Sequence, residues 1–237
     1  MSTMDVISKV RASLPIVLVA DADNNIVSKG SGFVFQNQEL VVTCAHVVAN
    51  KPNSSVYLQF EDNDQFVSAS VALIDQDHDI ALLRFKPDKN RQPLISSEKS
   101  VQEGMSVLFS GYPLSLMSLT THQGIVSSII KDPTGMTRYL IDGTVNPGNS
   151  GGPLLDVDGK VLGVIDATRR ENNDIISKLK FMNTGAISLH GLDLVELYNA
   201  LANNLQLGVG YAVPAGYIPS YPEPKANTKT KKERKKK

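Results

Sequence analysis

The sequence of 237 residues contains no tryptophan, one cysteine and no long apolar run. A single cysteine, Cys44, cannot form an intramolecular disulfide, which is typical of proteins that stay in a reducing compartment. The first apolar run, residues 15–20 (PIVLVA), is too short for a transmembrane helix and for most signal-peptide cores. We therefore expect an intracellular protein, cytoplasmic or nuclear, without a membrane span.

Metal and cofactor motifs are also missing. The four histidines, His46, His78, His122 and His190, are scattered along the chain, and one cysteine excludes the usual zinc clusters. No glycine-rich phosphate-binding loop is present. The sequence therefore predicts no metal and no cofactor.

The net charge of zero hides an uneven distribution. Residues 222–237 carry eight Lys or Arg and two Glu, so this tail has a charge of +6 and the remainder a charge of −6. Like charges repel and the tail has no apolar face to bury, so we expect it to be disordered. The tail is either simply solvated or binds polyanions. In the second case it acts as a nuclear localisation signal or contacts nucleic acid or an anionic membrane.

The rest of the chain, with its 41% hydrophobic content, is typical of a folded protein and is rich in short β-branched runs separated by turn residues. The Asp-Gly pair within DVDGK, residues 156–160, is a strong hairpin signal. Helical spacing of apolar residues is limited to residues 192–205, with a short helix expected at 4–12. We predict one all-β domain over residues 1–221 with a late C-terminal helix. Strands are expected within residues 15–20, 30–35, 40–48, 56–60, 65–74, 81–85, 106–113, 124–130, 138–142 and 153–167.

Ser150 lies in an unusual stretch, PGNSGGP, at residues 147–153. Alone, this stretch is compatible with an ordinary tight turn. Upstream, however, His46 follows an apolar strand and Asp79 precedes another. Serine, histidine and aspartate are the components of a nucleophilic triad, and the chain order His, Asp, Ser is that of chymotrypsin.

Each of these residues also has a simpler interpretation. His46 alone would be read as a buried core histidine, Asp79 alone as a turn residue, and the neighbouring His78 is a rival for the same role. Residues 148–152 also satisfy the G-x-S-x-G pattern of a hydrolase elbow, with an acid between Asp156 and Asp174 and a later His190. That elbow requires a strand, a turn and a helix within a parallel sheet, whereas the residues after Ser150 read as a β-hairpin.

With TCAHVV at residues 43–48, HDIALL at 78–83 and PGNSGGPL at 147–154, the chain resembles the trypsin-like serine peptidases of chymotrypsin fold. GSGFVF at residues 30–35 and GIVSSI at 124–129 resemble stretches of the HtrA/Deg branch in particular. The resemblance covers residues 14–168 and implies a double β-barrel. The length left after it suggests no appended PDZ domain.

The resemblance implies a serine endopeptidase that acts on proteins or peptides through an acyl-enzyme. His46 would be the general base, Asp79 its orienting carboxylate and Ser150 the nucleophile. The backbone N–H groups of Gly148 and Ser150 would form the oxyanion hole. The oligomeric state is left open.

By position, residues 144–147 should border the primary specificity pocket, with Thr144 opposite Ala167 and Thr168. None of these residues is charged, so we expect a small or medium apolar residue before the cleaved bond rather than Arg or Lys. Either residues 183–188 or residues 208–214 form the last strand of the pocket wall, and the sequence does not decide between them.

Asp166 departs from the family pattern, which has a small or neutral residue at this position. A second carboxylate near Asp79 would raise the pKa of one of the two groups. This departure leaves a second interpretation open, in which the fold is a catalytically inactive or latent scaffold that binds peptides.

Overall fold

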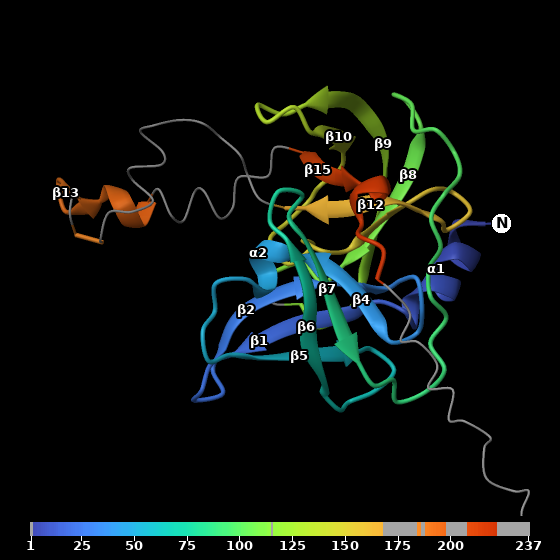
Figure 1. Ribbon diagram of the computed structural model, residues 1–237. Coiled ribbons are helices and arrows are strands. Elements are labelled where there is room, and N and C mark those ends of the chain that lie inside the picture. Colours follow the sequence, from blue (N-terminus) through green and yellow to red (C-terminus); the bar gives the residue numbers. More distant parts are fainter. Residues whose placement is uncertain (1, 115, 168–183, 186–187, 198–207, 222–237) are drawn as a thin grey trace, which may run out of the picture.

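The computed structural model describes residues 2–114, 116–167, 184–185, 188–197 and 208–221. Most of its strands form two β-sheets packed side by side (Figure 1). Both sheets are antiparallel in the strand pairs that build them. This arrangement confirms the all-β prediction. No helix in the described ranges is long and apolar enough to cross a membrane.

The first sheet has seven strands in the order β2-β1-β5-β6-β7-β4-β3. Strands β1 and β4, each next to an edge strand, are buried along their whole length, which explains their continuous apolar sequences. The strands are β1 (Pro15–Ala20), β2 (Ile26–Ser31), β3 (Phe33–Val34), β4 (Leu40–Cys44), β5 (Ser55–Phe60), β6 (Val67–Asp75) and β7 (Ile80–Phe85).

The second sheet is a closed barrel in the order β10-β15-β12-β11-β8-β9. The expected DVDGK hairpin joins β11 to β12, with Gly159 in the left-handed region at φ +79°. The strands are β8 (Ser106–Gly111), β9 (Thr120–Lys131), β10 (Thr137–Asp142), β11 (Pro153–Leu155), β12 (Val161–Asp166) and β15 (Val209–Pro214).

Strand β15 resolves the alternative that the sequence left open for the last wall strand. It pairs with β10 on one side and with β12 on the other, so residues 209–214 close the barrel. Ser188 and Leu189 form the short strand β13, which pairs with β14 (Leu192–Asp193) and with no other strand of the described chain. The chain between β12 and β15 is thus an insertion in the second barrel.

The helices agree with the sequence in part. Helix α1 (Thr3–Arg11) matches the expected helix at residues 4–12 and begins with a capping box between Ser2 and Asp5. In the late segment, residues 194–197 are helical after β14, and residues 198–205 of the expected helix lie outside the described residues. This segment precedes β15, so it does not end the fold. The predicted tail, residues 222–237, also lies outside the described residues, and its contacts stay a prediction.

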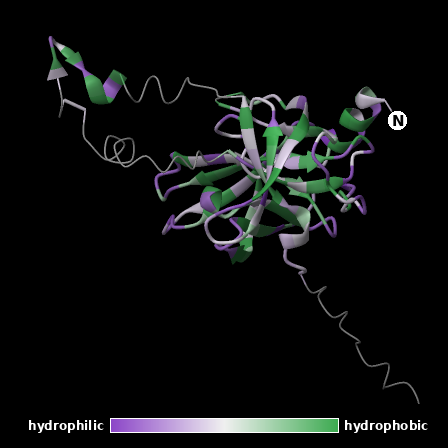
Figure 2. Ribbon diagram, turned by 90° about the horizontal axis from the view of Figure 1, so that it is seen from above, coloured by the Kyte–Doolittle hydropathy of each residue, from purple (hydrophilic) through white to green (hydrophobic). Residues whose placement is uncertain are grey.

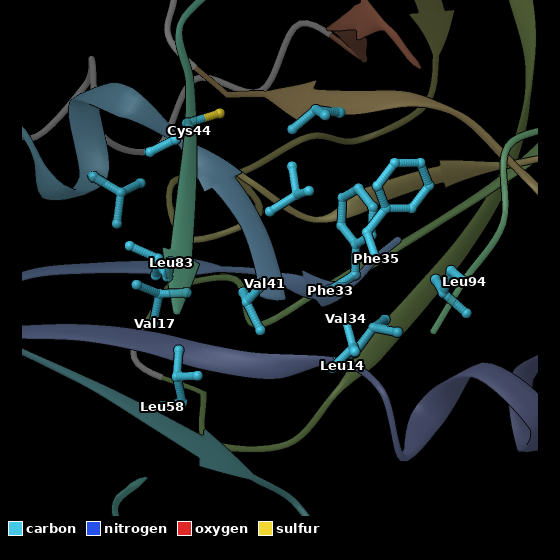
Figure 3. Close-up of a cluster of buried hydrophobic side chains, with 14 of the residues drawn as sticks. Leu14, Val17, Phe33, Val34, Phe35, Val41, Cys44, Leu58, Leu83 and Leu94 are labelled. Carbon is cyan, nitrogen blue, oxygen red and sulfur yellow. The ribbon is translucent and has the colours of Figure 1, made fainter. Parts of the chain in front are cut away.

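The main apolar core extends from the first sheet into the second barrel. Figure 3 shows part of it, including Phe33 and Phe35, whose rings meet edge to face with centroids 5.7 Å apart. The same cluster contains Val164 and Val213 from the second barrel. A smaller cluster fills the interior of that barrel around Phe109. Apolar segments run through the strands in Figure 2, and the shared core fixes the two sheets against each other.

The connection between the sheets is anchored by Arg91, whose side chain is fully buried. Its guanidinium forms ion pairs with Asp62 at 3.1 Å and Asp88 at 2.8 Å, and lies 3.4 Å from the ring centroid of Phe60. A buried charge is tolerated only when it is paired in this way. Arg91 therefore ties the connection that follows β7 to the first sheet.

The first sheet and the second barrel also meet through the backbone at Gly151. This residue has φ +87°, and a Cβ atom at this position would lie 2.2 Å from the Ser31 carbonyl oxygen and 2.3 Å from Thr43 Oγ1. Only glycine fits both the conformation and the space.

We predict that Gly151→Ala destabilises the fold strongly, because it adds a steric clash to an unfavourable φ. The matched control is Gly104→Ala, which has φ +83° but no atom within 4 Å of the added Cβ. The control should lose only about 1–2 kcal/mol, the cost of the left-handed conformation. Thermal or urea unfolding measures both losses. Equal losses would contradict the close approach of the first sheet and the second barrel at Gly151.

Candidate active site

His46 and Asp79 are held together by two hydrogen bonds. The imidazole Nδ1 lies 2.7 Å from Asp79 Oδ2, and the backbone N–H of His46 donates to Asp79 Oδ1 at 2.9 Å. His46 lies in the short helix α2 (Ala45–Val48), directly after β4. The carboxylate therefore fixes both the ring and the backbone of the histidine.

The position of Asp79 follows from an unusual backbone conformation. It has φ +57°, a value that aspartate tolerates better than most residues. Its own carbonyl accepts a hydrogen bond from the Ala45 N–H at 3.0 Å. The turn before β7 is thereby joined to the start of α2, and the carboxylate is aimed at His46.

His78, the rival of Asp79 in the sequence, belongs to a different pair. Its Nδ1 lies 2.7 Å from Asp75 Oδ2 within the same turn. Its ring stacks on Tyr217, with centroids 4.3 Å apart. These contacts give His78 a structural role away from the pair of His46 and Asp79.

The loop around Ser150 is held by Ser31, the last residue of β2. The Ser31 N–H donates to the Ser150 carbonyl at 2.8 Å, and its hydroxyl donates to the Gly148 carbonyl at 2.6 Å. The same hydroxyl accepts from the Tyr112 N–H at 2.9 Å. Sequence reasoning did not single out Ser31, although it lies in the GSGFVF stretch.

The Ser150 side chain is oriented toward β12. Its Oγ accepts a hydrogen bond from the Ala167 N–H at 3.2 Å. Within the described chain, no hydrogen bond joins this Oγ to His46. The structure thus joins two of the three predicted residues directly, and a bond between Ser150 and His46 requires a change in the Ser150 side chain or its surroundings.

Two amides beside Ser150 remain available to a ligand. The N–H groups of Gly148 and Ser150 donate to no acceptor in the part of the chain that the structure describes. Gly148 has φ +97°, and a Cβ at this position would lie 2.4 Å from the Tyr112 carbonyl oxygen. Neighbouring groups of the loop are bonded, with the Leu114 N–H donating to the Pro147 carbonyl at 2.6 Å. The loop thus presents two donors of the kind that bind an oxyanion.

The predicted pocket residues lie where β15 begins. Thr144 is partly buried, and the preceding residue, Gly143, donates its N–H to the Gly208 carbonyl at 2.9 Å. Val145 packs against Gly210, because a Cβ on Gly210 would lie 2.1 Å from Val145 Cγ2. Val145 and Gly210 are thus neighbours that the sequence analysis did not pair, because the last strand was unassigned.

The other two predicted pocket residues differ in what the structure says of them. Ala167 follows β12 directly and touches Ser150 through the hydrogen bond already described. Thr168 lies outside the described residues.

The environment of His46 contains charges of both signs. Burial acts to lower the pKa of its imidazole, while the hydrogen bond and charge of Asp79 and the charge of Asp166 raise it. Lys51, which donates to the His46 carbonyl at 3.0 Å, opposes them. The net result is a raised pKa, because the two carboxylates together outweigh burial and the lysine.

Cys44 is the remaining reactive group near the pair. Its Sγ donates to the Ile165 carbonyl at 3.2 Å, and its side chain is completely buried. Burial and the charges of Asp79 and Asp166 raise the pKa of the thiol well above its ordinary value. Cys44 therefore keeps its proton near neutral pH and is a poor nucleophile.

Cys44, His46 and Asp79 offer atoms within 4.8 Å of one another, a spacing compatible with a metal ion. His46 and Asp79 are already bonded to each other, and a thiol that holds its proton is a poor metal ligand. This donor set therefore fits a proton-transfer pair better than a metal centre.

The hydrolase-elbow alternative does not match the geometry. Ser150 is followed by the antiparallel hairpin of β11 and β12, not by a helix. Asp156 is fully buried and accepts hydrogen bonds from the Ser97 hydroxyl at 2.7 Å and the Lys160 N–H at 2.9 Å. The Asp156 carboxylate is thus already bonded to Ser97 and to the hairpin turn.

Comparison with known proteins agrees with the fold and the order of the motifs. The family model described as "Trypsin-like peptidase domain" matches residues 30–164, more than half of the chain. The chain belongs to this family, and the enzyme class expected from the sequence, the serine-type endopeptidases, is that of the family.

Individual relatives are of the HtrA type. The chain is 35% identical over 144 residues to "Serine protease HTRA2, mitochondrial" of Drosophila virilis and of Drosophila grimshawi. These matches cover 58% of this chain and 34% and 33% of the relatives, so the chain matches about a third of their length. A solved structure of an HtrA-type protease with a tripeptide superimposes with a TM-score of 0.66 at 20% identity, covering 91% of this chain and 60% of that one.

We predict that Asp79→Asn lowers the pKa of His46, because it removes a neighbouring negative charge and leaves burial and Lys51 in place. With four histidines in the chain, imidazole NMR titration can follow each one, and His46→Ala identifies the signal of His46. His122, in β9 of the second barrel and stacked on Phe109, is the internal control, and its signal should be the same in parent and variant. An unchanged His46 pKa would contradict the pairing.

Proposed function

We propose that this chain is a serine endopeptidase in which His46, Asp79 and Ser150 form the catalytic triad. The observation that carries the proposal is the double hydrogen bond from the backbone and ring of His46 to the Asp79 carboxylate. It fixes Nδ1 as the proton-bearing nitrogen and leaves Nε2 as the basic one. Family membership supports the same chemistry.

In the proposed reaction, Ser150 Oγ attacks the carbonyl carbon of the peptide bond while His46 Nε2 takes its proton. The tetrahedral oxyanion accepts hydrogen bonds from the N–H groups of Gly148 and Ser150. The intermediate collapses to an ester on Ser150, and the leaving amine takes the proton from His46. Water then attacks the ester with His46 as base again, and the proton returns to Ser150 as the acid product leaves.

In the described geometry the Ser150 side chain is not yet bonded to His46, so it must reorient when the substrate binds. Ser150 Oγ, which accepts from the Ala167 N–H, must turn its own O–H toward His46 Nε2. The energy at stake is modest, because a neutral hydrogen bond contributes about 0.5–1.5 kcal/mol net. Binding of a peptide substrate is sufficient to offset it.

The direct test is labelling by a fluorophosphonate probe, which reacts with activated serines. We predict that the parent is labelled and cuts unfolded casein, while Ser150→Ala and His46→Ala abolish both. Labelling that persists in Ser150→Ala would overturn the assignment of the nucleophile.

A folded parent that is neither labelled nor active would favour the second candidate function, a latent or inactive scaffold that binds peptides. The observation in its favour is that Ser150 Oγ is bonded to the Ala167 N–H and, within the described chain, has no hydrogen bond to His46. Casein that binds the parent without being cut would support that function.

We further propose that the peptidase prefers a small or medium apolar residue before the cleaved bond. Thr144, Ala167 and Thr168, the predicted pocket residues, are uncharged. The contact between Val145 and Gly210 supports the proposal, because the valine occupies space at the wall of the predicted pocket.

This preference can be measured with peptides that differ only in the residue before the cleaved bond. We predict the highest kcat/KM for Ala or Val, and a shift toward larger apolar residues in Val145→Ala, which removes the branched side chain. Best cleavage after Arg by the parent would contradict the proposed pocket.

A further inference from the structure

Asp166 is a buried carboxylate that the proposed mechanism does not use. It is the last residue of β12 and is 1% exposed. Burial of a carboxylate is costly unless its charge interacts favourably with its surroundings. A charged group retained at such a position therefore calls for a physical role.

The residues on either side of Asp166 both contact the candidate active site. The Ile165 carbonyl accepts from Cys44 Sγ at 3.2 Å, and the Ala167 N–H donates to Ser150 Oγ at 3.2 Å. Cys44 in turn lies two residues before His46. The end of β12 thus packs between the strand that leads to His46 and the loop that carries Ser150.

The titratable and charged groups around this end of β12 come from several elements. Cys44 ends β4, His46 is in α2, Lys51 follows α2, and Asp79 precedes β7. Tyr211 of β15 is the cross-strand partner of Asp166 itself. Asp166 acts on His46 in the same direction as Asp79, because both negative charges favour the protonated imidazole, while Lys51 acts against them.

We propose that Asp166 is a positioning residue of the active site, whose buried negative charge acts with Asp79 to stabilise the imidazolium of His46. This inference rests on the proposed function, in which His46 becomes an imidazolium when it takes the proton of Ser150. The two carboxylates share the task. Asp79 orients the ring through hydrogen bonds, and Asp166 adds a second charge from the end of β12.

The proposal has a consequence for pH dependence. The negative charge of Asp166 makes His46 more basic, and a protonated His46 cannot act as the base. As the pH is lowered, the rate of the proposed reaction therefore begins to fall at a higher pH than it would without Asp166. The neutral variant Asp166→Asn should move the acid limb of kcat/KM to lower pH. The charge-keeping variant Asp166→Glu should leave the limb near that of the parent.

The experiment follows the His46 imidazole by NMR titration, which does not depend on catalysis. We expect Asp166→Asn to lower the pKa of His46, and Asp166→Glu to leave it nearly unchanged. Asp158→Asn is the matched charge control, because Asp158 lies at the opposite end of the hairpin that leads into β12. It should leave the His46 titration unchanged.

An unchanged or raised His46 pKa in Asp166→Asn would overturn the proposal and leave Asp166 a structural residue. If that variant does not fold, Asp166→Ser provides a smaller neutral side chain, and the same two outcomes apply. An inactive parent whose His46 pKa still falls in the neutral variant would contradict the proposed function and support the electrostatic role of Asp166.

Discussion

The candidate active site depends on the backbone contact between Ser31 at the end of β2 and the loop that carries Ser150. Ser31 holds this loop at the carbonyls of Gly148 and Ser150, and the glycine at position 151 permits the close approach. His46 and Asp79 lie next to strands β4 and β7 of the first sheet, whereas Ser150 lies in the loop before β11 of the second barrel. The three residues are brought into one region only because the two sheets share a core and this contact.

Within that region, opposing electrostatic effects determine the pKa of the His46 imidazole. Burial of His46 and the nearby Lys51 favour a neutral ring, while Asp79 and Asp166 favour a charged one. The net effect is a raised pKa of His46, which makes its imidazole a stronger base for proton transfer. Burial, together with the charges of the same carboxylates, raises the pKa of the Cys44 thiol and keeps it protonated, so Cys44 does not compete with Ser150 as a nucleophile.

The sequence predicted much of the fold because its strands carry strong local signals. Apolar runs such as residues 15–20 and the Asp-Gly turn at 158–159 specify strands and a hairpin without reference to the rest of the chain. His46, Asp79 and Ser150 were predicted as a group from their order along the chain. The geometry unites His46 with Asp79, and their catalytic roles stay a proposal.

Features that depend on distant contacts were not predictable in this way. Residues 183–188 and 208–214 were both candidates for the last strand of the pocket wall, and the pairing with β10 and β12 selects the second. The role of Ser31 follows from hydrogen bonds to residues more than 80 positions away, for which a single serine carries no signal. The orientation of the Ser150 hydroxyl depends on a side-chain rotamer, which a sequence does not specify.

Two predictions stay untested. Thr168 lies outside the described residues, and the intracellular location stays a prediction.

The most direct test of the account is a crystal structure of the protein after reaction with a peptidyl phosphonate. The account predicts phosphorus bonded to Ser150 Oγ and a phosphonyl oxygen about 2.7–3.1 Å from the N–H groups of Gly148 and Ser150. His46 should retain its bonds to Asp79 and turn Nε2 toward the adduct. An unmodified Ser150 still bonded to the Ala167 N–H, or an adduct on another residue, would contradict the claim that Ser150 and the pair of His46 and Asp79 form one catalytic site.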